Sequence, residues 1–219
     1  MNGTRENEAI RNDGLLIVEC TPEAFEGKQN EGNFLRELAT VLRPTINVKV
    51  ESVNSDRKFL EILGESTESV VHISAHGRDY LSKHNFLGVK GTIIRFSEGF
   101  VTSQQISKKL LEKKKKERPK LIVMSACQSG SNEMVRAIKE AGCRYFIAPM
   151  ENTYWFDAAV FIALFYRLLF IEGSTPWVSF RKTDNALKSL LRNYSGYWNF
   201  YDYGRNCFLS NGRKNSFLV

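Results

Sequence analysis

Short apolar runs alternate with amphipathic segments along most of the chain. The runs contain few polar residues, which is typical of strands buried on both faces of a parallel sheet. They occupy 14–20, 70–74, 143–150 and the stretch that starts at Leu121. Apolar residues at helical spacing occur in 33–42, 56–63, 103–117, 131–141, 153–171 and 176–193. This alternation predicts an α/β fold with a mainly parallel central sheet and helices on both faces.

Three further segments predict the edges of this fold. Residues 46–53 alternate between apolar and polar side chains, which indicates an edge strand with one wetter face. Residues 86–101 consist of short apolar stretches separated by glycines, which predicts a β-hairpin. A last strand is expected at 207–210, where it closes one edge of the sheet.

Length and composition indicate one domain. The chain has 219 residues, of which 42% are hydrophobic, enough to bury a sizeable core. We find no repeat or linker that divides it. We expect a disordered tail over 1–13, a single domain over 14–212 and a flexible C-terminal tail over 213–219.

The net charge of +7 is compatible with nucleic acid, an anionic surface or an acidic protein partner. Part of the excess is a run of four lysines, 113–116, at the expected end of a helix, where positive charge favours the helix dipole. The run is either a solvated helix end or a partner-binding patch. The aromatic segment 194–203 can stack bases or pack in the core. We expect no nucleic acid as a direct ligand.

Cysteine usage and hydropathy bear on metals and location. The four cysteines form no C-x-x-C pair and no cluster with zinc spacing, so no metal site is predicted. The polar start of the sequence has no signal-peptide pattern. The most apolar stretch, Ala158–Tyr166, is far shorter than the ~20 residues that cross a bilayer. We expect a cytoplasmic protein with reduced thiols and no membrane association.

Two strand ends carry the candidate chemistry. The apolar run LIVMSACQSG breaks into a turn at Cys127, and SVVHISAHG ends in His76 and Gly77. Active sites of open α/β sheets lie beyond the carboxyl ends of the strands. A thiol and an imidazole there suit nucleophilic catalysis, although small buried cysteines are common. His72, inside its strand, is expected to be a core histidine.

Both motifs resemble those of the CHAT peptidases, a branch of the caspase-like cysteine peptidases. The 51-residue separation of His76 and Cys127 is similar to that in caspases, where it is about 50. Similar segments are FSEGFVTSQQI (96–106), the long helical segment 154–174 and YWNF (197–200). The resemblance covers 70–212 and lacks the tetratricopeptide repeats that often accompany this family. It implies a caspase-like three-layer sandwich with the hairpin near the site.

The resemblance also implies roles for three residues. Cys127 is the nucleophile of a cysteine endopeptidase, and His76 is the acid/base partner that protonates the leaving amine. The backbone N–H groups of Gly77 and Cys127 form the oxyanion hole. No cofactor is implied.

Caspase-like enzymes select the residue before the cut with acidic or basic pockets. Asp157, Glu151 and Asp79 lie near expected strand ends and are candidates for an acidic pocket. Asp157 has a simpler explanation, because an acid in the first turn stabilises a helix. Arg78 is the competing candidate for an acidic substrate.

The family implies a protein substrate and regulated complexes, including bacterial antiviral defence and cell death. We therefore expect activation in trans by a protein partner. The main alternative is a catalytically silent caspase-like adaptor or scaffold that binds a partner protein. A scaffold needs neither His76 nor Cys127, so the presence of both favours the peptidase.

Overall fold

A computed structural model describes residues 10, 14–20, 31–79, 92–192, 194, 196–210 and 213–216. Eight strands form one sheet in the order β11-β10-β9-β8-β7-β3-β1-β2. The five strands from β2 to β8 are parallel neighbours, and the remaining pairs are antiparallel. The bounds are β1 Leu15–Glu19, β2 Val48–Ser52, β3 Val70–Ser74, β7 Leu121–Ser125, β8 Tyr145–Pro149, β9 Trp198–Asp202, β10 Cys207–Ser210 and β11 Arg213–Ser216.

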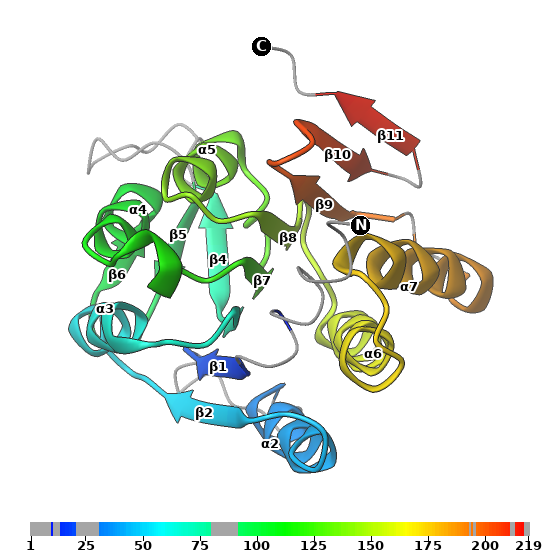
Figure 1. Ribbon diagram of the computed structural model, residues 1–219, viewed down its shortest axis with the longest axis horizontal. Coiled ribbons are helices and arrows are strands. Elements are labelled where there is room, and N and C mark those ends of the chain that lie inside the picture. Colours follow the sequence, from blue (N-terminus) through cyan, green and yellow to red (C-terminus); the bar gives the residue numbers. More distant parts are fainter. Residues whose placement is uncertain are drawn as a thin grey trace.

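Helices cover both faces of this sheet, so the predicted three-layer α/β sandwich is confirmed (Figure 1). On one face α3, α4 and α5 pack side by side, and on the other α2 and α7 flank α6. The bounds are α2 Glu31–Leu42, α3 Asp56–Glu65, α4 Ser103–Leu111, α5 Asn132–Glu140, α6 Trp155–Tyr166 and α7 Pro176–Leu190. No helix in these described segments is long and apolar enough to cross a bilayer.

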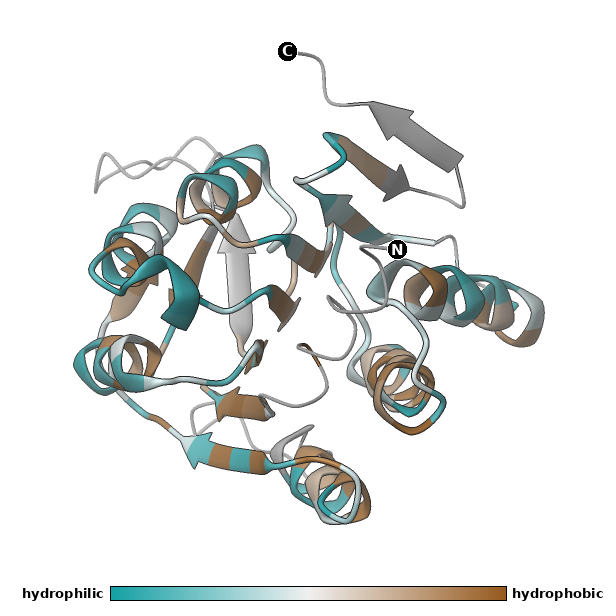
Figure 2. Ribbon diagram, viewed as in Figure 1, coloured by the Kyte–Doolittle hydropathy of each residue, from teal (hydrophilic) through white to brown (hydrophobic). Residues whose placement is uncertain are grey.

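The apolar strands bury both of their faces. Every residue of β1, β3, β7 and β8 is buried, and alternate residues enter different clusters. Ile17 packs toward α2, α6 and α7, whereas Leu16 packs toward α3, α4 and α5. Figure 2 shows β1, β7 and β8 as mainly hydrophobic inside a shell of helices whose outer surfaces are polar. Each such apolar side chain contributes ~1.5–3 kcal/mol, which explains why these runs form the centre of the fold.

Helix α4 begins where the helical segment 103–117 was predicted to begin, but it ends earlier. Its N-cap is Thr102, which forms a capping box with Gln105. It ends at Leu111 rather than near 117, and a short 3-10 turn, η2, occupies Lys115–Glu117. The buried Lys113 bonds to the end of α3, which turns the chain out of the helix early.

A second sheet of three antiparallel strands follows β3 directly. Its strands are β4 His76–Asp79, β5 Thr92–Arg95 and β6 Phe100–Thr102. The predicted hairpin thus corresponds to β5 and β6, with the first part of 86–101 outside the described residues. His76 and Gly77 were predicted to end the β3 strand, but they begin a strand of this smaller sheet.

The C-terminal part holds more strands than predicted. The aromatic residues of β9, with Trp198 and Phe200 fully buried, pair beside β8. Cys207–Ser210 is therefore an inner strand, and β11 lies at the edge, where a flexible tail over 213–219 was expected. The N-terminal tail expected over 1–13 lies outside the described residues except for Ile10, which is buried in the core. The long helix expected over 153–171 changes into a π-helical turn, η3, at Arg167–Ile171.

Candidate active site

Strand register places the two candidate catalytic residues at adjacent strand ends. In the parallel pair β3–β7, Ser74 is the partner of Ser125. His76 and Cys127 each follow these serines by two residues. The backbone of His76, Gly77 and Asp79 is described, but the side chains of His76 and Asp79 are not. The backbone alone brings the histidine and cysteine positions to the same edge of the sheet.

The turn after β7 fixes the direction of Cys127. Gln128 adopts a left-handed conformation with φ of 57°, unusual for a side chain with a Cβ. The N–H of Gly130 donates to the carbonyl of Pro149 at 2.8 Å. A Cβ at Gly130 would lie 3.0 Å from that oxygen, so this approach requires glycine. Residues 128–130 therefore have a structural role, because their backbone bonds shape the turn that carries Cys127.

The sulfur of Cys127 is held by one neighbouring residue. The Thr153 N–H donates to Cys127 Sγ at 3.4 Å, and the thiol lies 3.9 Å from the Thr153 carbonyl oxygen. Cys127 is half-buried, so these contacts orient the sulfur without covering it.

The other three cysteines are buried. Burial raises the pKa of Cys20, with the Glu19 charge adding to the effect. Burial also raises the pKa of Cys143, to about 12, against the smaller opposing effect of Arg118 and Lys113. None of these three thiols is accessible to a substrate. Cys127 is the one cysteine of the chain whose side chain meets solvent.

His72 is a core histidine, as predicted. Its Nδ1 lies 2.8 Å from the Tyr166 hydroxyl, and its Nε2 lies 3.0 Å from the Ser125 hydroxyl. The ring is fully buried, and this burial lowers the pKa of His72 to about 3. It stays neutral at physiological pH and takes no part in the open site.

Two of the three predicted pocket residues line one cavity of about 440 Å³. Glu151 reaches it from the loop after β8, and Asp157 from the first turn of α6. The Tyr197 hydroxyl donates to Asp157 Oδ2 at 3.1 Å. The remaining lining residues are Asn152, Tyr154, Leu190, Leu191, Arg192 and Tyr194.

This cavity, here called the tyrosine pocket, adjoins Cys127. The N–H of Gln128 donates to the carbonyl of Glu151 at 3.1 Å. Thr153, which holds the sulfur, lies between two lining residues of the chain. The pKa of Tyr197 is raised chiefly by burial, then by Asp157, and also by the charge of Cys127. The pocket therefore opens beside the candidate nucleophile.

Asp79 and Arg78 belong to β4 in the smaller sheet. Their backbones pair with Thr92 and Ile93 of β5, and their side chains lie outside the described residues. Asp79 is thus placed on another element from Glu151 and Asp157, and its contribution to a pocket stays a prediction.

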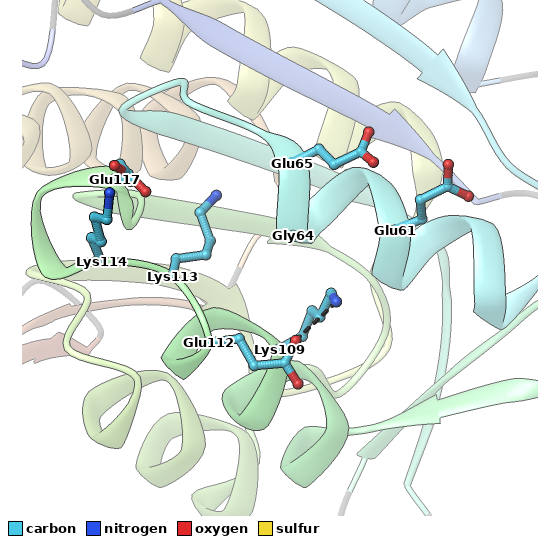
Figure 3. Close-up of a pocket in the computed structure, with 8 residues that line it drawn as sticks. All are labelled: Glu61, Gly64, Glu65, Lys109, Glu112, Lys113, Lys114 and Glu117. Carbon is cyan, nitrogen blue, oxygen red and sulfur yellow. Dashed lines mark hydrogen bonds and ion pairs between the residues drawn. The ribbon is translucent and has the colours of Figure 1, made fainter.

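A second cavity, of about 350 Å³, lies between the last turns of α3 and α4, the helices that precede β3 and β7 (Figure 3). Lys113 there is buried, and its Nζ donates to the carbonyl of Leu63 at 3.1 Å and to the hydroxyl of Ser66 at 3.0 Å. The prediction of a solvated lysine run is therefore wrong at Lys113, although the next three lysines are exposed. No group of metal-binding side chains occurs among the described residues.

Sequence reasoning missed three residues of this site. Thr153 gives no signal, because it acts through its backbone. Tyr194 and Tyr197 belong to the aromatic segment for which the sequence left base stacking and core packing open, and both pack on the core and also line the pocket. The later rings Trp198, Phe200 and Tyr201 are core residues, and single-residue hydropathy does not distinguish the two groups.

Comparison with known proteins shows a family and a solved structure to which this chain is similar. The family model described as "CHAT domain" matches residues 9–201. A solved structure, protein GSU0716 from Geobacter sulfurreducens, has 10% identity and a TM-score of 0.47, with 85% of this chain and 92% of that chain covered. No curated protein matches this chain.

Proposed function

Because this chain belongs to the CHAT domain family of caspase-like cysteine peptidases, we propose that it is a cysteine endopeptidase with Cys127 as nucleophile and His76 as acid/base. The observation that carries the proposal is the β3–β7 register, which places both residues two positions beyond the paired Ser74 and Ser125. The half-buried sulfur, oriented by the N–H of Thr153, supports it further.

In the proposed reaction the Cys127 thiolate attacks the carbonyl carbon of the scissile peptide bond. The carbonyl oxygen becomes an oxyanion, which accepts hydrogen bonds from the N–H groups of Gly77 and Cys127. The intermediate collapses as the C–N bond breaks, and His76 protonates the leaving amine. Water then attacks the thioester while His76 accepts its proton. The acid product leaves and the free thiolate returns, so no cofactor is needed.

The tyrosine pocket is proposed to hold the side chain before the cut. Glu151 and Asp157 give it two carboxylates, against the single guanidinium of Arg192. An acidic lining favours a basic side chain by charge complementarity. Asp79 is proposed as a third acidic contributor from β4. This proposal places a lysine or arginine, rather than an acidic residue, before the scissile bond.

Activation by a protein partner in trans is part of the proposal. The CHAT resemblance implies a regulated complex in the cytoplasm, within a bacterial defence or cell-death system. If the purified chain is fully active by itself, activation by a partner is contradicted, but the proposed peptidase function is not.

Cleavage of a mixed peptide library, with and without proteins encoded by neighbouring genes, tests this function. We expect cuts after basic residues that disappear in Cys127→Ala and His76→Ala. The absence of cuts in every condition, with a stable partner complex still formed by the Cys127→Ala protein, favours the scaffold instead.

A further inference from the structure

The pocket beside Cys127 is walled by aromatic rings as well as by acids. Tyr154, Tyr194 and Tyr197 all line it. The ring centroids of Tyr194 and Tyr197 are 5.0 Å apart, and the ring planes are inclined by 60°. Two inclined rings form a corner, and Tyr154 adds a third ring that is 79% exposed at the rim. This arrangement is typical of sites that bind cations through aromatic faces.

Both corner rings are anchored by carboxylates. The Tyr194 hydroxyl donates to Asp184 Oδ1 at 3.0 Å, and Lys188 holds the other oxygen of Asp184 at 2.6 Å. The Tyr197 hydroxyl donates to Asp157 at 3.1 Å. These bonds fix the rings before a ligand arrives, which lowers the entropy lost on binding. A phenol that donates to a carboxylate also gains electron density, which strengthens its attraction for a cation.

We propose that the tyrosine pocket is an aromatic cage for a weakly hydrated cation, the side chain of arginine or N-methylated lysine, in preference to unmodified lysine. Tyr194 and Tyr197 are its specificity-determining residues. The role of this cage in choosing a cleavage site rests on the proposed peptidase function, whereas the binding of the cation does not.

The preference follows from desolvation and shape. A lysine ammonium is compact and strongly hydrated, so entry into a ring-lined corner removes much of its hydration. A guanidinium is planar, more weakly hydrated and able to stack on an aromatic face. Methylation of an ammonium has a similar effect, which is why aromatic cages recognise methylated lysine. Asp157 and Glu151 then balance the charge of either group.

Binding of small probes to the Cys127→Ala protein tests the cage without any catalysis. The probes are butylguanidinium, butyltrimethylammonium, butylammonium and the neutral butylurea, followed by NMR shifts of labelled tyrosine rings. We expect the first two cations to bind about tenfold more tightly than butylurea. Butylammonium is expected to bind more weakly than either of them.

Variants separate the cage from general charge attraction. Tyr197→Leu and the exposed Tyr154→Leu should each reduce the preference for butylguanidinium over butylurea about threefold or more. Phe156→Leu is the matched control, because Phe156 is exposed on α6 but does not line the pocket. Equal binding of cation and urea, no binding of any probe, or a preference unchanged in both tyrosine variants overturns the proposal. If the protein binds these cations but cleaves no peptide, the proposed peptidase function is wrong and the aromatic cage is still supported.

Discussion

The two edges of the parallel sheet each carry a cavity and a cysteine, but of Cys127 and Cys143 only Cys127 is exposed to solvent. At the carboxyl edge Cys127 follows β7 beside the tyrosine pocket of about 440 Å³. At the amino edge Cys143 precedes β8 and interacts electrostatically with Lys113, which lines the cavity of about 350 Å³ in Figure 3. The cavities are similar in size, and charged residues line both.

The edges differ in what their polar groups already bind. At the amino edge the Lys113 ammonium bonds to Leu63 and Ser66, Lys109 pairs with Glu112 at 2.9 Å, and Cys143 is buried. The Lys113 bonds tie the end of α4 to the end of α3. At the carboxyl edge the sulfur is oriented but accessible. The difference teaches that a charged cavity is a weaker sign of function than a reactive atom held in place and left exposed.

The largest expected effect is the difference in peptide cleavage between variants of Cys127 and Cys143. Cys127→Ala should lower peptide cleavage by at least about 10³-fold, because the nucleophile is lost. Cys143→Ala should leave cleavage within about twofold and cost only ~1 kcal/mol of stability. Initial rates with a cleaved library peptide, beside urea unfolding curves, measure both. Comparable losses of activity in the two folded variants contradict the assignment.

Thiol alkylation sharpens the same contrast. Iodoacetamide should label Cys127 of the native protein on the order of 100-fold faster than Cys20 or Cys143, because the buried thiols react only after local opening. Peptide mapping by mass spectrometry gives the three rates. In denaturant the difference should vanish. Equal native rates contradict the exposed position of Cys127.

Charge in the two cavities should also have unequal effects. Asp157→Asn should lower kcat/KM for a peptide with a basic residue before the cut about 10–100-fold, as expected for the loss of one charged hydrogen bond. Glu112→Gln removes the same charge at the amino edge and should change kcat/KM less than twofold. A larger loss of kcat/KM in Glu112→Gln than in Asp157→Asn contradicts the proposal that the substrate binds in the tyrosine pocket.

Low pH should lower the free energy of unfolding through His72, which is buried in the core between the two edges. The unfolded chain binds a proton below a pKa of about 6.5, whereas the folded protein does so only near 3, so stability is lost as pH falls between these values. From pH 6.5 to 5 the loss from His72 is about 2 kcal/mol. Urea unfolding across this range measures it, and His72→Gln should flatten the slope. An identical slope in the variant contradicts this cause.

The lysine run gives the smallest effects. Lys113→Met should lower the unfolding free energy by about 1.5 kcal/mol, because two carbonyls and a hydroxyl lose their donor. Lys115→Ala, on an exposed side chain, should stay within about 0.5 kcal/mol. Thermal unfolding compares the two. Neither variant should alter cleavage; a loss of activity in Lys113→Met at full stability contradicts its structural role.

Much of this fold could be predicted from the sequence because its signals are local. The apolar runs at 15–19 and 70–74 needed only their own composition to indicate buried strands, and the approach of positions 76 and 127 follows from two parallel strands of equal register. The end of α4 could not be predicted, since Lys113 bonds to a carbonyl 50 residues away.

The same limit applies to the site. Thr153 contacts Cys127 across 26 residues, and Tyr197 reaches Asp157 across 40. No local pattern encodes such pairs, because they depend on where β8, α6 and β9 meet. Glu151 and Asp157 were predictable as residues near strand ends. Their shared pocket required the fold.

Covalent trapping tests the central claim most directly. A peptidyl acyloxymethyl ketone with arginine before the reactive group is incubated with the protein, alone and with partner proteins, and intact masses are recorded. We predict one adduct per chain, on Cys127, absent in Cys127→Ala and slowed in His76→Ala. An adduct on another residue, or none in any condition while iodoacetamide still labels Cys127, contradicts a peptidase built on this cysteine.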